Sequence, residues 1–153
     1  MTDERELDAP RTAGISLQMP VPLGAMNDAR DFYRRLFGRD PDFSPHDDFL
    51  EWAPIRDQEC WFQVVGQEDA EPLINRVRFR VTDMREAIRF LDAIGLVHSE
   101  PSQLPGVVAF VDFSDPWGNR LGYYEDLVPS GQQEEYRGTS VHDASQFAGF
   151  SER

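Results

Sequence analysis

The order of the expected helices and strands is repeated once along the chain. In each half a strand precedes a helix that ends at a glycine, Gly38 in the first half and Gly95 in the second, and three short strands follow. The two glycines are 57 residues apart (95 − 38), a period longer than that of solenoid repeats. We therefore predict an α+β fold of two βαβββ units that share one core.

Local signals place the elements of each unit. The first unit is predicted to contain a helix through 31–37, capped by Asn27 or Asp28. In the second unit, Asp83 and Glu86 predict a capping box for a helix over 84–94. Alternating or apolar runs predict strands over 15–19, 41–44, 49–52, 59–65, 75–81, 107–111 and 120–124.

A tight turn is predicted between the last two strands. Asp115 favours the first position of a type I turn, Pro116 presets φ at the second, and Gly118 accepts the left-handed conformation that follows. The turn would join 107–111 to 120–124 as an antiparallel hairpin whose two faces differ.

Length and composition bound the domain organisation. The chain has 153 residues, of which 40% are hydrophobic, so one core can form without disulfides or a structural metal. The lone Cys60 lies in an apolar run and is expected to fill space in the core. We predict a polar N-terminal arm (1–13), one domain (14–127, with units 14–66 and 73–127) and a polar C-terminal tail (128–153).

The net charge of −13 limits the possible partners. Nucleic acids and anionic membranes are not expected, because both require a basic footprint. All 15 basic residues are arginine, which excludes Schiff-base chemistry at a lysine. No apolar run approaches membrane-spanning length and the acidic N-terminus is unlike a signal peptide, so we expect a cytoplasmic protein.

Three segments together resemble one known group of proteins. They are the helix motif Asp-Phe-Tyr-Arg-Arg-Leu-Phe-Gly (31–38), the strand motif Asn-Arg-Val-Arg-Phe-Arg-Val (75–81) and the hairpin Asp-Pro-Trp-Gly-Asn-Arg-Leu (115–121). With the paired units, they resemble the glyoxalase, bleomycin-resistance and dioxygenase superfamily, also called vicinal oxygen chelate proteins, and its glyoxalase-like domains common in actinobacteria. The resemblance implies a curved, half-open mixed β-sheet barrel with helices outside, a ligand cavity inside and usually a homodimer.

Enzymes of that superfamily hold a divalent metal on four strands, and the matching positions here lack the usual donors. They are Ser16, Arg76 and Gly122, whereas the fourth strand offers Gln63 or Glu59. An arginine would repel a metal ion and occupy its space. The histidines His46, His98 and His142 lie elsewhere in the sequence and are not expected to be ligands. We predict no metal site and no cofactor.

Strand alternation predicts the residues that face the cavity. Arg76, Arg78 and Arg80 share one face, where they would bind an anionic group or pair with acidic residues such as Glu51, Glu59 and Glu125. Trp52, Trp61 and Trp117 would offer flat surfaces to an aromatic ligand, or fill the core instead. The predicted ligand-binding residues are Gln18, Trp52, Trp61, Gln63, Arg76, Arg78, Arg80, Arg120 and Tyr124, and Ser16 shares their face.

These observations predict a binding protein. No nucleophile, His-carboxylate pair or phosphate-binding loop supports a catalytic residue. We expect a metal-independent protein, a homodimer, that sequesters a small organic molecule, such as an antibiotic or related aromatic metabolite. The alternatives are a metal-dependent lyase, isomerase or dioxygenase of the same superfamily, and a non-catalytic interaction module.

Overall fold

A computed structural model describes residues 9–128 of the chain. The predicted arm (1–13) and tail (128–153) therefore lie mostly outside the described residues, and the predicted domain boundaries stay predictions. Within the described residues, the first strand begins at Ile15 and the last ends at Asp126.

The elements follow the predicted βαβββ order twice. The N-terminal unit contains β1 (Ile15–Pro22), the 3-10 helix η1 (Leu23–Ala25), α1 (Met26–Phe37), β2 (Phe43–His46), β3 (Phe49–Trp52) and β4 (Cys60–Gln67). The C-terminal unit contains β5 (Val77–Arg80), α2 (Met84–Ala93), β6 (Ser102–Leu104), β7 (Val108–Ser114) and β8 (Arg120–Asp126). The α+β fold of two βαβββ units is confirmed.

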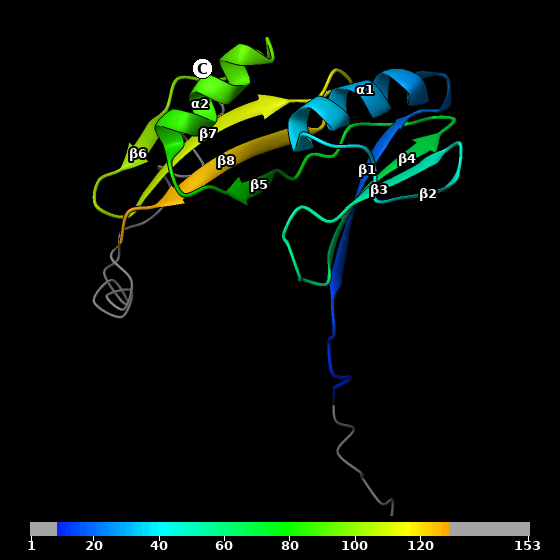
Figure 1. Cartoon of the computed structure of the whole chain (residues 1–153), viewed down its shortest axis with the longest axis horizontal. Coiled ribbons are helices and arrows are strands. Elements are labelled where there is room, and N and C mark those ends of the chain that lie inside the picture. The colour runs from blue at the N-terminus through cyan, green and yellow to red at the C-terminus, as the bar shows by residue number, and fades with distance from the viewer. Residues whose placement is uncertain (1–8, 129–153) are drawn as a thin grey trace, which may run out of the picture.

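Each unit forms its own four-stranded mixed sheet. The strand orders are β1-β4-β3-β2 and β5-β8-β7-β6, and the first pair of each sheet is parallel. Figure 1 shows the two sheets side by side, with α1 and α2 on the same side of them. Within residues 9–128 the two sheets are not closed into one barrel. Because both helices lie on one side of the sheets, the opposite face of each sheet carries no helix among the described residues.

The helix ends show which local signals operate. Gly38 adopts φ 74° and its N–H donates to the carbonyl of Arg34 at 2.8 Å, which ends α1 as predicted. The predicted cap of α1 is wrong, because the helix continues from η1 and begins at Met26, before Asn27. Asp83 does cap α2, through bonds from the backbone N–H groups of Arg85 and Glu86.

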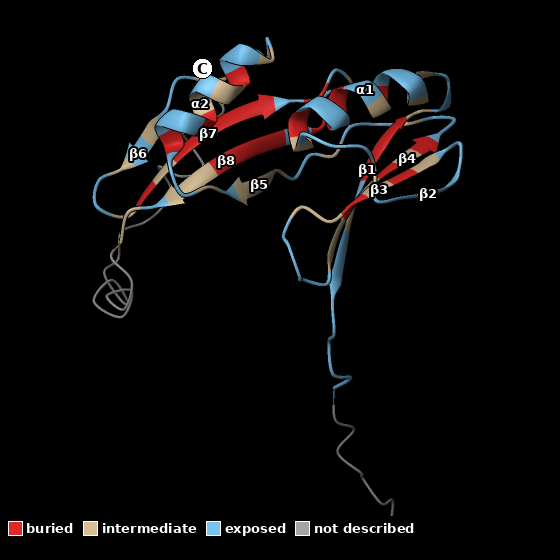
Figure 2. Cartoon of the chain, viewed as in Figure 1, coloured by how far each residue is buried: buried red, intermediate tan, exposed pale blue. Residues whose placement is uncertain are grey.

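One apolar core lies between the helices and the strands. Helix α1 buries Ala29, Phe32, Tyr33 and Leu36, and α2 buries Met84, Ala87 and Leu91. Figure 2 shows the buried residues gathered where helices and strands meet. The Phe79 ring of β5 contacts Phe37 at 5.6 Å and Phe62 at 5.7 Å between ring centroids, so the two units share this core.

A buried hydrogen-bond network also joins the units at the 115–119 turn. The Asp115 carboxylate accepts bonds from the Tyr33 hydroxyl at 2.6 Å and from the Asn119 side-chain amide at 2.7 Å. The Asn119 side-chain nitrogen also donates to the Pro20 carbonyl at 2.8 Å. The side-chain oxygen of Asn119 accepts a hydrogen bond from the Leu73 N–H at 2.9 Å. Because these groups are buried, each bond also prevents an uncompensated loss of hydration.

Within residues 9–128, neither α1 nor α2 is long and apolar enough to cross a membrane.

Candidate functional site

A groove of about 900 Å³ lies on the C-terminal unit. Asp112 of β7, Arg120 of β8 and Arg76, which directly precedes β5, line it, and the loop 95–100 lines it after α2. Phe32 of α1 contributes an apolar wall. The groove therefore combines charged groups with apolar surface, which suits a small organic ligand.

Two of the predicted arginines converge on one aspartate. The Nε atoms of Arg76 and Arg78 lie 3.2 and 3.3 Å from Oδ1 of Asp112. The register explains this contact, because Arg78 on β5 pairs with Gly122 on β8, which pairs with Asp112 on β7. The three residues form one row across the helix-free face of the sheet.

The predicted acidic partners of the arginines are wrong. Arg80 pairs with Asp126 at 3.3 Å, not with Glu125, whose carboxylate accepts the N–H of Met84 at the start of α2. Glu51 contacts Gln63 in the other sheet. The arginines thus pair with acidic groups of the chain, as the alternative prediction held, and the described partners are Asp112 of β7 and Asp126 at the end of β8.

Burial is the largest cause of the pKa shifts of Asp112 and Arg76. It raises the pKa of the Asp112 carboxyl above its ordinary value, although Arg76 and Arg78 act against this rise. It also lowers the pKa of Arg76, which Asp112 opposes and the charges of Arg78 and Arg120 reinforce. Oδ2 of Asp112 is buried with no hydrogen-bond partner among the described residues.

Arg120 differs from the other arginines of this face. Its side chain is exposed at the start of β8, and it makes no hydrogen bond or ion pair within residues 9–128. Its guanidinium is therefore available to a ligand in the groove.

The N-terminal sheet carries a second polar row. The Gln18 side-chain amide donates to Oε1 of Gln63 at 3.0 Å, and the Gln63 amide donates to Oε2 of Glu51 at 2.6 Å. Trp61 lies on the same helix-free face, half-buried, and its indole N–H donates to Glu59 at 3.2 Å. Because every second residue of a strand points to the same face, Gln18, Trp61 and Gln63 lie together on one face, as predicted.

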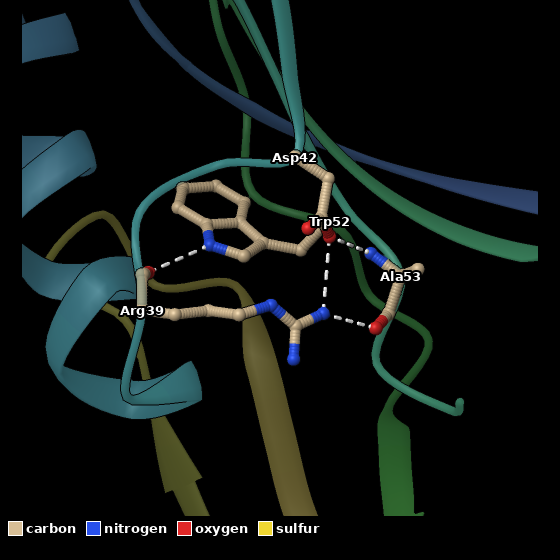
Figure 3. Close-up of polar contacts among 4 residues, drawn as sticks. All are labelled: Arg39, Asp42, Trp52 and Ala53. Carbon is tan, nitrogen blue, oxygen red and sulfur yellow. Dashed lines mark hydrogen bonds and ion pairs between the residues drawn. The ribbon is translucent and has the colours of Figure 1, made fainter.

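Trp52 lies in the core, because its position on β3 points toward the helix side of the sheet. It is 0% exposed and contacts the ring of Tyr33. Its indole N–H donates to the carbonyl of Arg39 at 3.0 Å, beside the contacts of Asp42 with Arg39 and Ala53 (Figure 3). Trp52 therefore fills the core, which was the alternative to its prediction as a ligand-binding residue, and its ring is not accessible to a ligand in this structure.

The remaining aromatic candidates lie apart from the groove. Tyr124 is half-buried on the helix-free face and pairs with Phe110 across β7 and with Arg80 across β5. Trp117 packs partly against the core and borders a separate hollow of about 610 Å³ beside α1.

His98 and Asp112 also line the groove, although neither was predicted as a site residue. The ring nitrogens of His98 lie 2.8 Å from the Ser99 carbonyl and 2.7 Å from Oδ1 of Asp92. The Ser99 carbonyl, and to a lesser extent Asp92, raise the pKa of His98. Asp112 could have been noticed as the one charged residue inside the apolar run 107–113.

The residues at the superfamily's ligand positions do not fit a metal ion. The Arg76 guanidinium occupies one position and is paired with Asp112. A Cβ atom at Gly122 would lie 2.8 Å from Oδ1 of Asp112, so there is no room for a carboxylate side chain. Within residues 9–128, no group of three His, Cys, Asp or Glu side chains is placed to hold a metal.

Solved structures of the same fold were found by structural comparison. A putative glyoxalase family protein from Bacillus anthracis superposes with a TM-score of 0.63 at 18% identity, over 78% of this chain and 99% of the other. A glyoxalase/bleomycin resistance protein from Catenulispora acidiphila gives a TM-score of 0.60 at 20% identity, over 74% and 98%.

A third neighbour is the fosfomycin resistance protein FosX of Listeria monocytogenes, solved with Mn(II) and a sulfate ion. Its TM-score is 0.59 at 13% identity, over 84% of this chain and 99% of the other. No family model matches the chain, and no curated protein matches it. The comparisons confirm the expected resemblance at the level of fold, which is that of the glyoxalase/bleomycin resistance/dioxygenase superfamily.

Proposed function

We propose that this protein binds a small organic molecule without the help of a metal ion. The observation that carries the proposal is the groove of about 900 Å³, in which apolar surface lies beside Arg76 and Arg120. Binding of this kind needs shape, desolvation and a few polar anchors, and it requires no chemical step.

An antibiotic or a related aromatic metabolite is the ligand that we propose. Half-buried Trp61 beside Gln18 and Gln63 gives the N-terminal sheet an aromatic surface with polar anchors. The structural neighbours include proteins named for bleomycin and fosfomycin resistance, which supports an antibiotic as the ligand.

We also propose that the protein is a cytoplasmic homodimer. Each sheet keeps a face without a helix, and Ile15 and Phe43 of the N-terminal sheet are 59% and 54% exposed. That sheet carries Glu51 on its helix-free face, whereas the C-terminal sheet carries arginines, so the faces of two copies are complementary in charge. Sedimentation velocity tests this, and a monomer at micromolar concentration would contradict it.

A metal-dependent lyase, isomerase or dioxygenase is the main alternative. It requires donors that the described ligand positions lack, or donors supplied by a partner chain. Calorimetric titration of chelator-stripped protein with Zn²⁺, Ni²⁺, Mn²⁺ and anaerobic Fe²⁺ separates the two functions. We expect no heat beyond dilution, and stoichiometric binding of any of these ions would favour the enzyme.

The direct test of the proposed function is a thermal-shift screen of the full chain. A library of antibiotics and aromatic metabolites of negative, neutral and positive charge is added at millimolar concentration, and a ligand of the folded state raises Tm. If no compound of any charge raises Tm, the binding function fails. A change of oligomeric state on truncation after Leu127 would then favour an interaction module.

A further inference from the structure

We propose that Arg76 and Arg120 form an anion-binding centre, and that the ligand carries a carboxylate or phosphate-type group on an apolar body. This inference rests on the proposed small-molecule binding and names the chemical class of ligand. The residues of this chain do not match the metal ligands of the superfamily. At one of the ligand positions stands the guanidinium of Arg76, a cation that would bind an anion rather than a metal ion.

An ion pair with a buried carboxylate holds the Arg76 side chain in place. Its Nε atom lies 3.2 Å from Oδ1 of Asp112, and that aspartate is only 8% exposed. Gly122 has no side chain, so Asp112 and Arg78 meet over its backbone, where a Cβ would lie 3.0 Å from Cγ of Arg78. Contact of Nε with an anchored carboxylate restrains the guanidinium before a ligand arrives, which lowers the entropic cost of binding.

Arg76 and Arg120 are neighbours across two paired strands. Val77 on β5 is paired with Leu121 on β8, so the preceding residues, Arg76 and Arg120, lie side by side at the start of the two parallel strands. Both line the groove, and the charge of Arg120 contributes to the lowered pKa of Arg76. Two neighbouring cations repel each other, and an anion bound between them would remove that repulsion.

Three acidic residues, Asp112, Asp115 and Glu100, line the same groove. Asp112 is paired with arginines, and Asp115 accepts four hydrogen bonds, from Tyr33, from the Asn119 amide and from two backbone N–H groups. Glu100 also lines the groove, on the loop after α2. Arg120 is paired with none of the described carboxylates, although the chain carries an excess of negative charge. An oxyanion is thus the ligand group that complements this guanidinium, through its planar set of donors.

The apolar wall of the groove defines the rest of the ligand. Phe32, Leu96, Phe113 and Pro116 line it beside the charged groups. A free inorganic anion would leave this surface in water, whereas an anion carrying a ring or alkyl group would cover it. The structure therefore favours an organic anion over a bare phosphate or sulfate ion.

The test compares probes that have one shape and different charge. Benzoate, benzamide and benzamidine are titrated into the ¹⁵N-labelled full chain, and dissociation constants are measured from backbone and arginine Nε–H chemical shifts. Phenyl phosphate and inorganic phosphate distinguish the two kinds of oxyanion and the contribution of the ring. We expect benzoate or phenyl phosphate to bind at least about 10-fold more tightly than benzamide, since hydrogen bonds to charged groups are the stronger ones.

Arg120→Gln is the decisive variant, because the Arg120 side chain is exposed and makes no hydrogen bond or ion pair within residues 9–128. We expect it to weaken binding of the preferred anion about 10- to 100-fold. Arg89→Gln, the same change at an exposed arginine of α2 that does not line the groove and donates to the Arg85 carbonyl, is the matched control and should leave binding unchanged. Arg76→Gln should give a loss similar to that of Arg120→Gln, with folding checked by circular dichroism.

The outcomes separate this inference from the proposed function. Equal affinity for benzamide or benzamidine, or an Arg120→Gln variant that binds benzoate and phenyl phosphate normally, would overturn the anion centre while leaving small-molecule binding intact. Tighter binding of inorganic phosphate than of phenyl phosphate would overturn the apolar body of the ligand. Absence of binding by every probe overturns the inference, and the thermal-shift screen then decides the proposed function independently.

Discussion

At the scale of single residues, Asp115 and Asn119 hold the two units together. The Asp115 backbone begins the turn after β7, while its carboxylate accepts the hydroxyl of Tyr33 from α1. Asn119, 0% exposed, connects that turn to the Pro20 carbonyl of β1. These bonds cross from one unit to the other, so their loss should affect global stability.

Tyr33→Phe removes one hydroxyl from this network. The Asp115 oxygen that accepts it would lose a partner in a buried site, so we expect the free energy of unfolding to fall by about 1–3 kcal/mol. Urea denaturation measures the change. Tyr124→Phe is the control, because the Tyr124 hydroxyl makes no hydrogen bond within residues 9–128, and an equal loss in both variants would contradict this role of Tyr33.

His98 should make stability depend on pH. The Ser99 carbonyl, together with Asp92 and Glu100, raises the pKa of His98 above its ordinary value. The stabilisation is therefore fully present below the unfolded pKa, near about 6.5, and is lost as pH rises through the folded pKa. We expect His98→Gln to lower Tm at pH 5.5 and to have a smaller effect at pH 8.5.

The control for that measurement is His46→Gln, since His46 is exposed at the end of β2. It should change Tm little at either pH. A His98→Gln effect that grows with increasing pH would have the wrong sign for a raised pKa and would contradict this role. An effect of equal size at both pH values would show that His98 acts through packing alone.

At the scale of elements, the close packing of β5, β8 and β7 depends on Gly122. A Cβ there would lie 2.8 Å from both the Val111 carbonyl and Oδ1 of Asp112. The first of these atoms belongs to the backbone of a paired strand and cannot move aside without disturbing the ladder. The glycine is thus required by the approach of neighbouring strands, not by an unusual φ.

Gly122→Ala should consequently destabilise the C-terminal sheet. We expect a loss of about 1–3 kcal/mol, typical of overpacking, in denaturant unfolding. Gly24→Ala is the matched control, because a Cβ at Gly24 would have no atom within 4 Å. Similar stability of the two variants would mean that Asp112 and Arg78 can rearrange freely, which would weaken the ion-pair description of the site.

At the scale of the whole molecule, net charge opposes the compact state. The chain carries a net charge of −13, and its ion pairs outside the Asp112 cluster are largely exposed, such as Arg80 with Asp126 at 64% and 42%. Exposed pairs contribute little to stability, so mutual repulsion among the acidic groups should outweigh them.

Raising NaCl from 20 to 500 mM should therefore increase Tm, because salt shortens the range of this repulsion from about 20 Å to below about 5 Å. Differential scanning calorimetry at pH 7.5 measures the shift. Arg120→Gln distinguishes screening from chloride binding at the groove, since general screening should persist in that variant. A Tm that falls with salt would mean that ion pairs dominate.

The sequence predicted the elements better than their contacts. Hydrophobic alternation and the stop glycines Gly38 and Gly95 act over a few residues, so they located both helices and the succession of helices and strands along the chain. The cap of α1 was missed because η1 precedes the helix and supplies its first turn, which overrides a local cap at Asn27 or Asp28.

Alternation along the strands also predicted which side chains share a face. It grouped Gln18 with Gln63 in one sheet and Arg76 with Arg78 in the other, as the observed contacts require. The same argument could not say whether the Trp52 face of β3 packs against a helix or faces outward, because both faces of that short strand contain large apolar residues.

By itself, the sequence determined two βαβββ units and the glycines that end their helices, since each depends on a local pattern. That the usual metal donors are missing at Ser16, Arg76 and Gly122 stays a prediction, because the family resemblance supplies those positions. Only the tertiary structure decided that Asp112 pairs with Arg76 and Arg78, that Trp52 is buried and that Arg120 borders a groove. These facts depend on the strand order β5-β8-β7, which brings residues more than 30 positions apart into one row. Strand order is set by burial of the whole core, which no short segment encodes.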